Sequence, residues 1–187
     1  MKELEISPPY IKNELTKKFC LVLDLDGTLV ERYNYDFGYY FFVRPGVFNL
    51  FEELFEYYEI NIFTASGREF ADLVIDKLDK DNKYISYRFF KYHCESTFPN
   101  YKRLDKIGRD LTKIVTIDDQ EIFAKYNMRN LIHISEWFKD IFDDELFYIT
   151  NKLKSIALSS KYDNDITLGL GEINNYLKSK REIKKKS

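Results

Sequence analysis

Short apolar runs recur along the chain at intervals that suit the strands of a buried sheet. The first covers residues 19–25 (FCLVLDL) and is not interrupted by alternating polar positions, which is typical of a strand buried on both faces of a parallel sheet. Similar short runs follow at 59–64, 84–90, 114–117 and 131–134. The pattern therefore predicts a strand at each of these places.

Apolar positions recur at helical spacing in three further segments, which are residues 47–58, 68–80 and 142–158. Strands that alternate with helices predict an α/β fold with a mainly parallel sheet. Residues 1–18 are expected to form an N-terminal arm, because Pro8 and Pro9 prevent a long helix there. The main domain is then expected to cover residues 19–176.

Polar side chains follow three of the predicted strands directly. They lie in the segments DLDGT (24–28), TASG (64–67) and DD (118–119). In open α/β sheets, functional sites lie beyond the carboxyl ends of the strands, so these three segments are expected to meet. Gly27 and Gly67 stand where a sharp turn is expected to need a permissive backbone.

The acids in these segments predict a metal site. Asp24 and Asp26 point to the same side of an extended strand unless the turn at Gly27 rotates the second one. Asp118 and Asp119 would approach from a neighbouring strand end. Carboxylates that crowd together repel each other, and a hard dication relieves this repulsion. Mg²⁺ is the usual choice where the substrate carries phosphate.

The same residue types suit phosphoryl transfer. One carboxylate can attack phosphorus and form an aspartyl phosphate, while a second, protonated one supplies a proton to the leaving oxygen. The hydroxyl of Thr64 and a nearby lysine can bind the phosphoryl oxygens. Two acids at a strand end are also common in turns and caps, which is the simpler interpretation. An EF-hand loop fits poorly, because Thr28 and Leu29 occupy positions that require an acid or Asn and then Gly.

Composition places the chain among soluble globular proteins. It has 187 residues, of which 44% are hydrophobic and 32% charged. The net charge of −2 implies no bulk attraction to nucleic acid or to an anionic membrane. Cys20 and Cys94 are expected to be free thiols in a reducing compartment. Neither a signal peptide nor a membrane-spanning run is expected, which favours the cytosol or the nucleus.

Aromatic residues and a basic stretch are the other notable features. Tyr33, Tyr35, Phe37 and Tyr39 alternate with other residues at strand spacing, so they form either a face packed on the domain or a wall for an extended peptide. Trp137 is expected to pack in the core. Residues 177–187 are expected to form a basic, solvated tail, with a nuclear-localisation signal or an electrostatic contact as the alternative.

The segment DLDGT after an apolar strand resembles the first motif of the haloacid dehalogenase (HAD) superfamily. From about residue 17 to 160 the chain resembles one branch, the RNA polymerase II C-terminal-domain phosphatase-like family, which includes the small C-terminal-domain phosphatases and the NLI-interacting-factor-like proteins. The segments that carry this resemblance are KKFCLVLDLDGTLV (17–30), VRPGV (43–47), NIFTASGREFAD (61–72), FKYHC (90–94), NYKRLDKIGRDLTKIVTIDD (100–119) and EWFKD (136–140). The resemblance implies a HAD-like Rossmannoid three-layer sandwich. Too few residues follow the first motif, or separate the second motif from the third, for a large cap domain, so residues 31–43 are expected to form only a short β flap.

The resemblance also implies a role for each matched residue. Asp24 matches the nucleophile, and Asp26 matches the general acid/base whose backbone carbonyl also binds Mg²⁺. Phosphate binding is implied for Thr64, Ala65 and Lys102, and metal binding for Asp24, Asp26, Asp118 and Asp119. Substrate contact at Tyr35 and Phe37 is expected from the aromatic spacing described above, not from the resemblance. The family commonly has Asn where this chain has Asp119, so the site carries one more negative charge and should still bind metal.

The resemblance thus implies a Mg²⁺-dependent phosphatase for phosphoserine or phosphothreonine in proteins, with the polymerase C-terminal domain among the substrates to consider. We expect a monomeric nuclear or cytoplasmic protein whose partner is a phosphorylated protein or peptide, without direct contact to nucleic acid or membrane. Two alternatives stay open. One is a peptide-binding module like a mitochondrial import receptor subunit, which the intact Asp24 and Asp26 disfavour. The other is a HAD phosphatase for small molecules.

Overall fold

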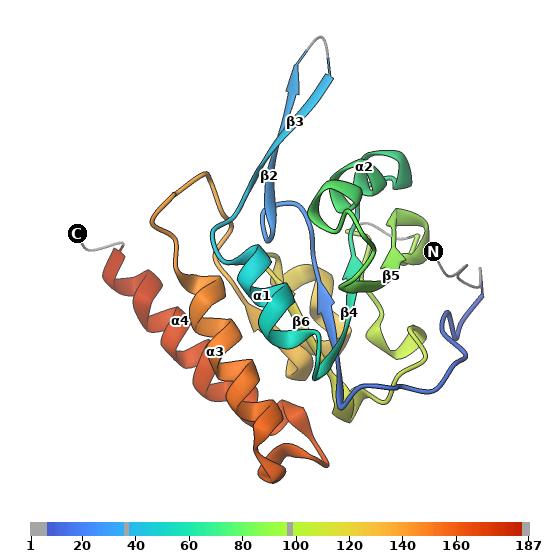
Figure 1. Ribbon diagram of the computed structural model, residues 1–187, viewed down its shortest axis with the longest axis vertical. Helices are drawn as coiled ribbons and strands as arrows, with labels where there is room; N and C mark the ends of the chain where they lie inside the picture. The colour runs from blue at the N-terminus through green and yellow to red at the C-terminus, as the bar shows by residue number, and fades with distance from the viewer. Residues whose placement is uncertain (1–6, 36–37, 97–98, 185–187) are drawn as a thin grey trace.

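A parallel sheet forms the centre of the computed structural model, which describes residues 7–35, 38–96 and 99–184 (Figure 1). Its strands are β1 (Phe19–Leu23), β4 (Tyr58–Phe63), β5 (Ile85–Phe89), β6 (Ile114–Asp118) and β7 (Leu131–His133). They lie in the order β5-β4-β1-β6-β7, and every neighbouring pair is parallel. All the strands predicted for the sheet are therefore confirmed.

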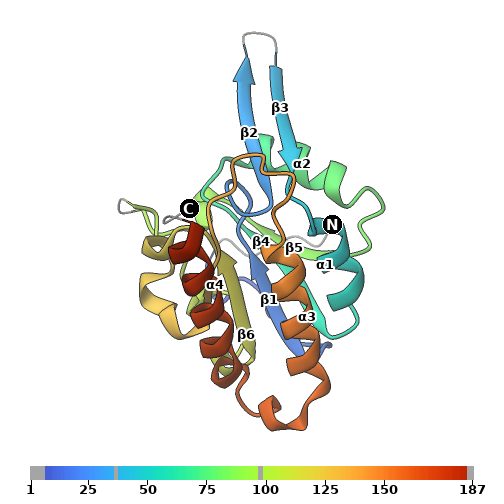
Figure 2. The ribbon, with the colours of Figure 1, turned by 90° about the vertical axis from the view of Figure 1, so that its left-hand side faces the viewer.

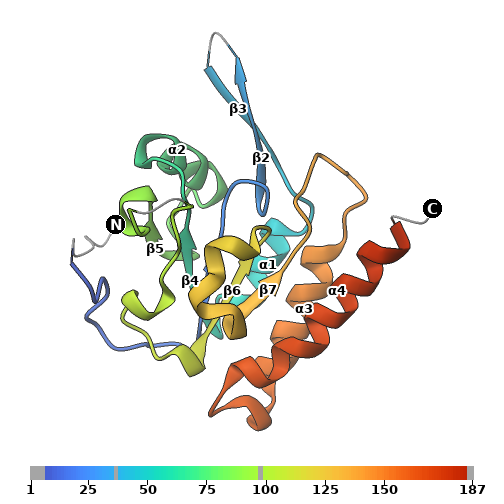
Figure 3. The same cartoon turned by 180° about the vertical axis from the view of Figure 1, so that it is seen from behind.

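Side chains alternate between the two faces of this sheet, and each face is buried. Phe19, Leu21 and Leu23 of β1 pack into a large cluster with four helices, namely α1 (Val47–Leu54), α2 (Arg68–Leu78), α3 (Glu145–Leu158) and α4 (Leu170–Lys184). Cys20 and Val22 face a smaller cluster on the other side. Figure 3 shows this second side from behind, where the N-terminal arm and short 3₁₀ segments replace long helices. The result is the predicted three-layer α/β sandwich.

The N-terminal arm forms part of this second layer. Tyr10 and Ile11 are buried, and their backbone N–H groups donate to the carbonyls of Lys106 and Ile107 at 3.0 and 2.9 Å. The two cysteines are free, as expected, and both are buried. Burial raises the pKa of the Cys94 thiol to about 11, which keeps it in the unreactive thiol form. None of the helices in the described part of the chain has the length and apolarity to cross a bilayer.

Several predicted boundaries differ from the structure. The helix predicted for 47–58 ends at Leu54, because Tyr58 already begins β4. The helix predicted for 68–80 ends at Leu78, and the one predicted for 142–158 begins only at Glu145. Helix α4 was not predicted, and it includes residues 177–184 of the expected basic tail.

The flap predicted after the first motif is a separate two-stranded sheet that rises from the body (Figures 1 and 2). Strands β2 (Val30–Tyr35) and β3 (Gly38–Val43) are antiparallel, with Tyr33 opposite Tyr40. The chain reverses between Tyr35 and Gly38, so the predicted single aromatic strand from Tyr33 to Tyr39 is wrong. Phe37 lies outside the described residues, as does the side chain of Tyr35. In the described part of the chain, this hairpin stands in place of a large cap domain.

Candidate active site

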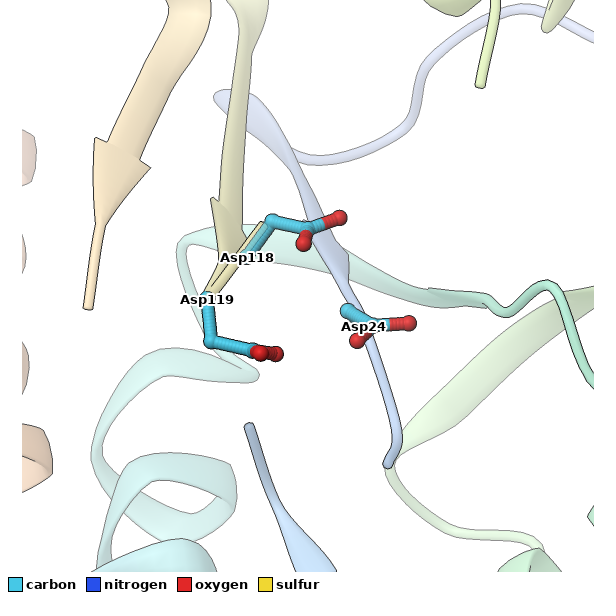
Figure 4. Close-up of side chains that lie close together, drawn as sticks. All are labelled: Asp24, Asp118 and Asp119. Carbon is cyan, nitrogen blue, oxygen red and sulfur yellow. The ribbon is translucent and has the colours of Figure 1, made fainter. Parts of the chain in front are cut away.

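Three adjacent strands bring the predicted polar segments to one edge of the sheet. β1 lies between β4 and β6, so Asp24, Thr64 and Asp118 stand at neighbouring carboxyl ends. The backbone N–H of Asp24 donates to the carbonyl of Ile117 at 3.0 Å, which extends the pairing of β1 with β6. Asp24, Asp118 and Asp119 are buried, and each offers one carboxylate oxygen to a group within 4.8 Å (Figure 4). The convergence predicted from the strand ends is thus observed for these three acids.

Lys102 completes this cluster from the loop before β6. Its ammonium group donates to Asp24 Oδ1 at 2.6 Å and to Asp118 Oδ2 at 2.7 Å. Its backbone N–H donates to the carbonyl of Phe123 at 2.9 Å, which anchors the loop. Burial alone would lower the pKa of Lys102, but the charges of Asp118 and Asp24 outweigh it and raise the pKa, so the side chain stays charged.

The cluster carries more negative charge than its lysine offsets. Burial raises the pKa of Asp24 well above its ordinary range, and the neighbouring Asp118 and Asp119 raise it further, against the opposing effect of Lys102. Burial likewise raises the pKa of Asp118. One ammonium group faces three carboxylates, so a cation would relieve the excess charge. Carboxylate oxygens are donors for hard divalent ions, and this donor set fits such an ion.

Asp26 does not join the three carboxylates. Its Oδ2 accepts a hydrogen bond from Ser66 Oγ at 2.6 Å, and its Oδ1 lies 3.5 Å from Arg32 Nε. Of the two orientations left open for Asp26, the structure has the one turned away from the other acids, because β1 ends at Leu23 and the same-side rule for alternate residues does not extend into the turn. Asp26 instead stands beside the cluster, with its side chain 28% exposed.

The turn after Asp26 depends on Gly27 and Thr28. Gly27 has a φ of +79°, and a Cβ there would lie 3.0 Å from Asp119 Oδ2, so the predicted need for glycine is confirmed. Gly67 has a φ of −65° and a ψ of 151°, which residues other than glycine can adopt, and nothing lies within 4 Å of a Cβ placed there. Its predicted need for glycine is therefore wrong. Thr28 was not predicted as a site residue. Its hydroxyl donates to Asp119 Oδ1 at 2.8 Å and accepts from the Asp119 N–H at 3.1 Å, which fixes that carboxylate.

A buried arginine, Arg44, stabilises the turn that contains Thr28. The Arg44 side chain donates to the carbonyls of Thr28 and Ser135 at 3.3 and 2.8 Å, and it forms two hydrogen bonds with Asp143. Sequence reasoning missed this role, although an arginine directly after the apolar strand segment YYFFV is a recognisable signal. Trp137 is buried nearby, as predicted, and its backbone N–H donates to the carbonyl of Gly27.

The cluster opens into a cavity of about 470 Å³ at the carboxyl edge of the sheet. Thr64 and Ala65 line it, as their predicted contact with phosphate requires, and Thr64 Oγ1 accepts from the Ser66 N–H at 3.0 Å. The other lining residues come from the first-motif turn, the hairpin and the loops after β6 and β7, and they are Asp24, Asp26, Gly27, Glu31, Arg32, Ser66, Asp119, Gln120, Phe123 and Glu136. The cavity thus gives outside molecules access to Asp24 and Asp26.

A family model described as NLI interacting factor-like phosphatase matches residues 19–166. The chain belongs to this family. Its match covers the whole central sheet and every acid of the cluster, so the resemblance inferred from the motifs is confirmed.

Individual relatives agree with this family. The chain is 35% identical over 174 residues to phosphatase PSR1 of Saccharomyces cerevisiae, which covers 83% of this chain and 40% of that protein. It is 32% identical over 163 residues to CTD small phosphatase-like protein 3 of Caenorhabditis elegans, covering 78% and 57% of the two chains. It is 32% identical over 155 residues to the human carboxy-terminal domain RNA polymerase II polypeptide A small phosphatase 1, covering 74% and 59%. The chain thus spans about half the length of these relatives.

Solved structures confirm the fold of this NLI interacting factor-like domain. The structure of Fcp1, an essential RNA polymerase II CTD phosphatase, superposes with a TM-score of 0.54 at 19% identity, over 86% of this chain and 61% of that one. The fission yeast Fcp1-R271A structure bound to beryllium fluoride gives a TM-score of 0.52 at 21% identity, over 77% and 52%. The predicted HAD-like fold is therefore confirmed, and the site stands at the expected edge of its sheet.

Proposed function

We propose that this chain is a Mg²⁺-dependent phosphatase for phosphoserine or phosphothreonine in proteins, with Asp24 as the nucleophile. The observation that carries the proposal is the placement of Asp24, which is buried at a strand end, held by Lys102 and accessible from a cavity that Asp26 also lines. Membership of the NLI interacting factor-like phosphatase family supports the same activity.

In the first half-reaction, a carboxylate oxygen of Asp24 attacks the phosphorus of the bound ester. The bond from phosphorus to the ester oxygen breaks, and protonated Asp26 gives its proton to that oxygen. Thr64, Ala65 and Lys102 are proposed to bind the phosphoryl oxygens, because Thr64 and Ala65 line the cavity and the Lys102 ammonium group contacts Asp24.

In the second half-reaction, water attacks the phosphorus of the aspartyl phosphate. Asp26, now ionised, accepts a proton from this water, and the bond to Asp24 breaks to release inorganic phosphate. Ser66 holds Asp26 through a 2.6 Å hydrogen bond beside the nucleophile, in a position from which it can serve both steps.

Asp24, Asp118, Asp119 and the backbone carbonyl of Asp26 are proposed to hold the Mg²⁺ ion. Bound there, the ion supplies positive charge that offsets the crowded carboxylates and the phosphoryl group. Thr28 keeps Asp119 oriented toward this place through the two hydrogen bonds described above.

A phosphoprotein substrate is supported by the names of the relatives, several of which are C-terminal-domain phosphatases. The RNA polymerase II C-terminal domain is one substrate to test, and the nucleus or cytoplasm is the place where we propose the chain acts. The cavity is bordered by the β2–β3 hairpin, through Glu31 and Arg32. A phosphorylated segment is therefore proposed to contact that hairpin.

Replacement of the nucleophile tests this function. Asp24→Asn should abolish hydrolysis of p-nitrophenyl phosphate and of a phosphoserine peptide, and EDTA should do the same to the wild-type chain. Circular dichroism and thermal unfolding check that the variant stays folded, which is expected because Lys102 keeps Asp118 as a partner. Full turnover by folded Asp24→Asn would contradict the mechanism. Binding of unphosphorylated peptides without any hydrolysis by the wild type would favour the peptide-binding alternative.

A further inference from the structure

Among the described residues that line the cavity, one side chain is cationic, that of Arg32 on β2. Its guanidinium carbon lies 4.5 Å from the centroid of the Phe70 ring on α2, and its Nε lies 3.5 Å from Asp26 Oδ1. An arginine over an aromatic face is held by the attraction between its charge and the ring electrons. The hairpin thereby brings a fixed positive charge to the side of Asp26.

The two oxygens of Asp26 are held differently. Oδ2 accepts the 2.6 Å hydrogen bond from Ser66, whereas Oδ1 is buried and accepts no hydrogen bond from any residue that the structure describes. Nitrogen donors hydrogen-bond to oxygen at about 2.7–3.2 Å, so Arg32 Nε stands just outside this range. Catalytic hydrogen bonds are often long in a free enzyme and shorten when the substrate binds.

The packing of the hairpin on α2 fixes where this guanidinium lies. In the β2–β3 register, Arg32 stands opposite Phe41, and Lys77 of α2 lies over the Phe41 ring at 5.5 Å from its centroid. Two contacts of the same kind, Arg32 on Phe70 and Lys77 on Phe41, thus join the hairpin to this helix. Figure 1 shows the base of the hairpin beside α2. A small shift of the hairpin would change the distance between Arg32 and Asp26.

We infer that Arg32 is a positioning residue for Asp26, brought to the site by the hairpin and braced by Phe70. This inference rests on the proposed function, in which Asp26 becomes negatively charged as its proton passes to the leaving oxygen. The guanidinium stabilises that developing charge and keeps Oδ1 from turning away, while Ser66 holds Oδ2.

The test compares substrates whose leaving groups need different degrees of protonation. A serine oxygen leaves only with a proton, whereas p-nitrophenolate leaves readily without one. Arg32→Gln should therefore lower kcat/KM for a phosphoserine peptide at least about tenfold more than for p-nitrophenyl phosphate. The ratio kcat/KM covers the steps up to departure of the leaving group, so slow hydrolysis of the phosphorylated enzyme does not mask the effect.

Matched variants separate positioning from a general structural role. Arg32→Lys keeps the charge but not the planar donor group, and it should restore part of the lost selectivity. Phe70→Leu should also lower kcat/KM more for the phosphoserine peptide than for p-nitrophenyl phosphate, but by a smaller factor. The Arg32→Gln, Phe70→Leu double variant should lose little more activity than Arg32→Gln alone, because both substitutions act through one contact. Arg68→Gln is the control, since Arg68 lies over the Phe90 ring at 5.7 Å and pairs with Asp72. It should leave the ratio of the two substrates as in the wild type.

Each other result would contradict the inference. Equal losses on both substrates, or an equal rise in KM, would mean that Arg32 binds the phosphoryl group that both substrates share. An Arg68→Gln variant with the same selective loss would point to a nonspecific effect of charge. A wild-type chain that hydrolyses no phosphate ester would overturn the proposed function, and the positioning role with it. If instead the wild type is active and Arg32→Gln loses the same activity on both substrates, only the positioning role of Arg32 is overturned.

Discussion

The buried carboxylate of Asp24 lowers the stability of the folded chain when no cation balances its charge. Its pKa is raised by burial and by the two neighbouring carboxylates, so the folded chain binds a proton at Asp24 more tightly than the unfolded chain does. A raised carboxyl pKa favours the folded state at low pH, and this contribution disappears as the pH rises through the folded pKa. Ionised Asp24 therefore destabilises the metal-free protein near neutral pH.

This sign leads to a prediction for Asp24→Asn without metal. Because asparagine carries no charge at any pH, the variant should unfold at a higher Tm than the wild type at pH 8 in EDTA. The difference should shrink as the pH falls below the raised pKa of folded Asp24 toward the ordinary carboxyl pKa of about 3.9, near which Asp24 becomes neutral in the unfolded wild-type chain as well. Thermal unfolding of both proteins between pH 8 and pH 4.5 measures it.

Asp105→Asn gives a control of opposite sign. Hydrogen bonds from Arg103 lower the pKa of Asp105, so its charge stabilises the fold at neutral pH and that contribution is lost in acid. Its replacement should lower Tm at pH 8, and only slightly, since the pair is partly exposed. A constant Tm difference for Asp24→Asn across this pH range would contradict the proposed repulsion in the cluster.

At the residue scale, the sequence predicted the groups that stand at strand ends and missed those that act through turns. The rule that parallel strands present their carboxyl ends together brought Asp24, Asp118 and Asp119 to one place. It could not place Asp26 or Thr28, because both lie beyond the end of β1 at Leu23, in a turn whose Gly27 has a φ of +79°. Arg32 was missed because its role depends on how a separate hairpin packs against α2.

At the scale of elements, strands were easier to predict than the last helix. A strand buried on both faces appears as an unbroken apolar run, whereas α4 buries only Leu170, Ile173 and Leu177 along 15 residues. The rest of that helix is polar and strongly basic toward its end, so its composition resembles a solvated tail. Tertiary packing against β7 and α3, which local pattern does not contain, decides its structure.

The buried side of α4 can be tested by substitution. Leu177→Ala should lower the free energy of unfolding by about 2–5 kcal/mol, since the side chain is fully buried and its removal leaves a cavity. Ile183→Ala on the same helix is the matched control, because Ile183 is 69% exposed and its loss should cost less than about 0.5 kcal/mol. Urea denaturation compares the two. Similar values for both variants would show that residues 177–184 behave as the tail expected from composition.

The hairpin is the element that we propose to contact a peptide substrate. Its outer face carries Tyr33, Tyr40 and Phe42, with the Tyr33 and Phe42 rings edge to face at 5.8 Å and Lys139 over Tyr33 at 4.2 Å. Tyr40 and Phe42 are 59% and 52% exposed. Glu31, opposite Phe42 in the register, lines the cavity, so this face continues toward Asp24. A peptide that reaches Asp24 can therefore contact these rings.

Replacing both Tyr40 and Phe42 by alanine should lower kcat/KM for a phosphoserine peptide about tenfold, because contacts remote from the reacting bond no longer orient the substrate. Hydrolysis of p-nitrophenyl phosphate, which is too small to reach these rings, should change much less. Phe48→Ala on α1 removes an aromatic side chain of equal exposure, 52%, and serves as the control. If the peptide and the small ester lose activity equally, the hairpin has a structural role rather than a role in recognition.

At the scale of the whole molecule, the sheet and its helices leave the carboxyl edge of the sheet open. Four helices cover one face of the sheet, and the arm with short 3₁₀ segments covers the other, and in the described ranges the narrow hairpin rises farthest beyond the strand ends (Figure 2). The cavity of about 470 Å³ is therefore a crevice at the surface. Enzymes that close over a small substrate exclude water and gain from every contact around it. In an open crevice, the phosphate group must instead be oriented by contacts that the rest of a larger ligand makes with the protein.

This architecture predicts a preference for substrate size. A phosphorylated segment in extended form can place its phosphate at Asp24 while its flanking residues lie along the hairpin, whereas a sugar phosphate contacts only the crevice. We expect kcat/KM for a good phosphoserine or phosphothreonine peptide to exceed that for any sugar phosphate by at least about tenfold, or about 1.4 kcal/mol in transition-state binding. A panel of phosphopeptides and phosphorylated metabolites, assayed by phosphate release with the same enzyme preparation and Mg²⁺ concentration, measures this ratio. The Tyr40→Ala, Phe42→Ala double variant should bring the ratio closer to one, because it removes contacts that only the peptide makes. A metabolite hydrolysed faster than every phosphopeptide would contradict the open-site argument and favour a small-molecule phosphatase.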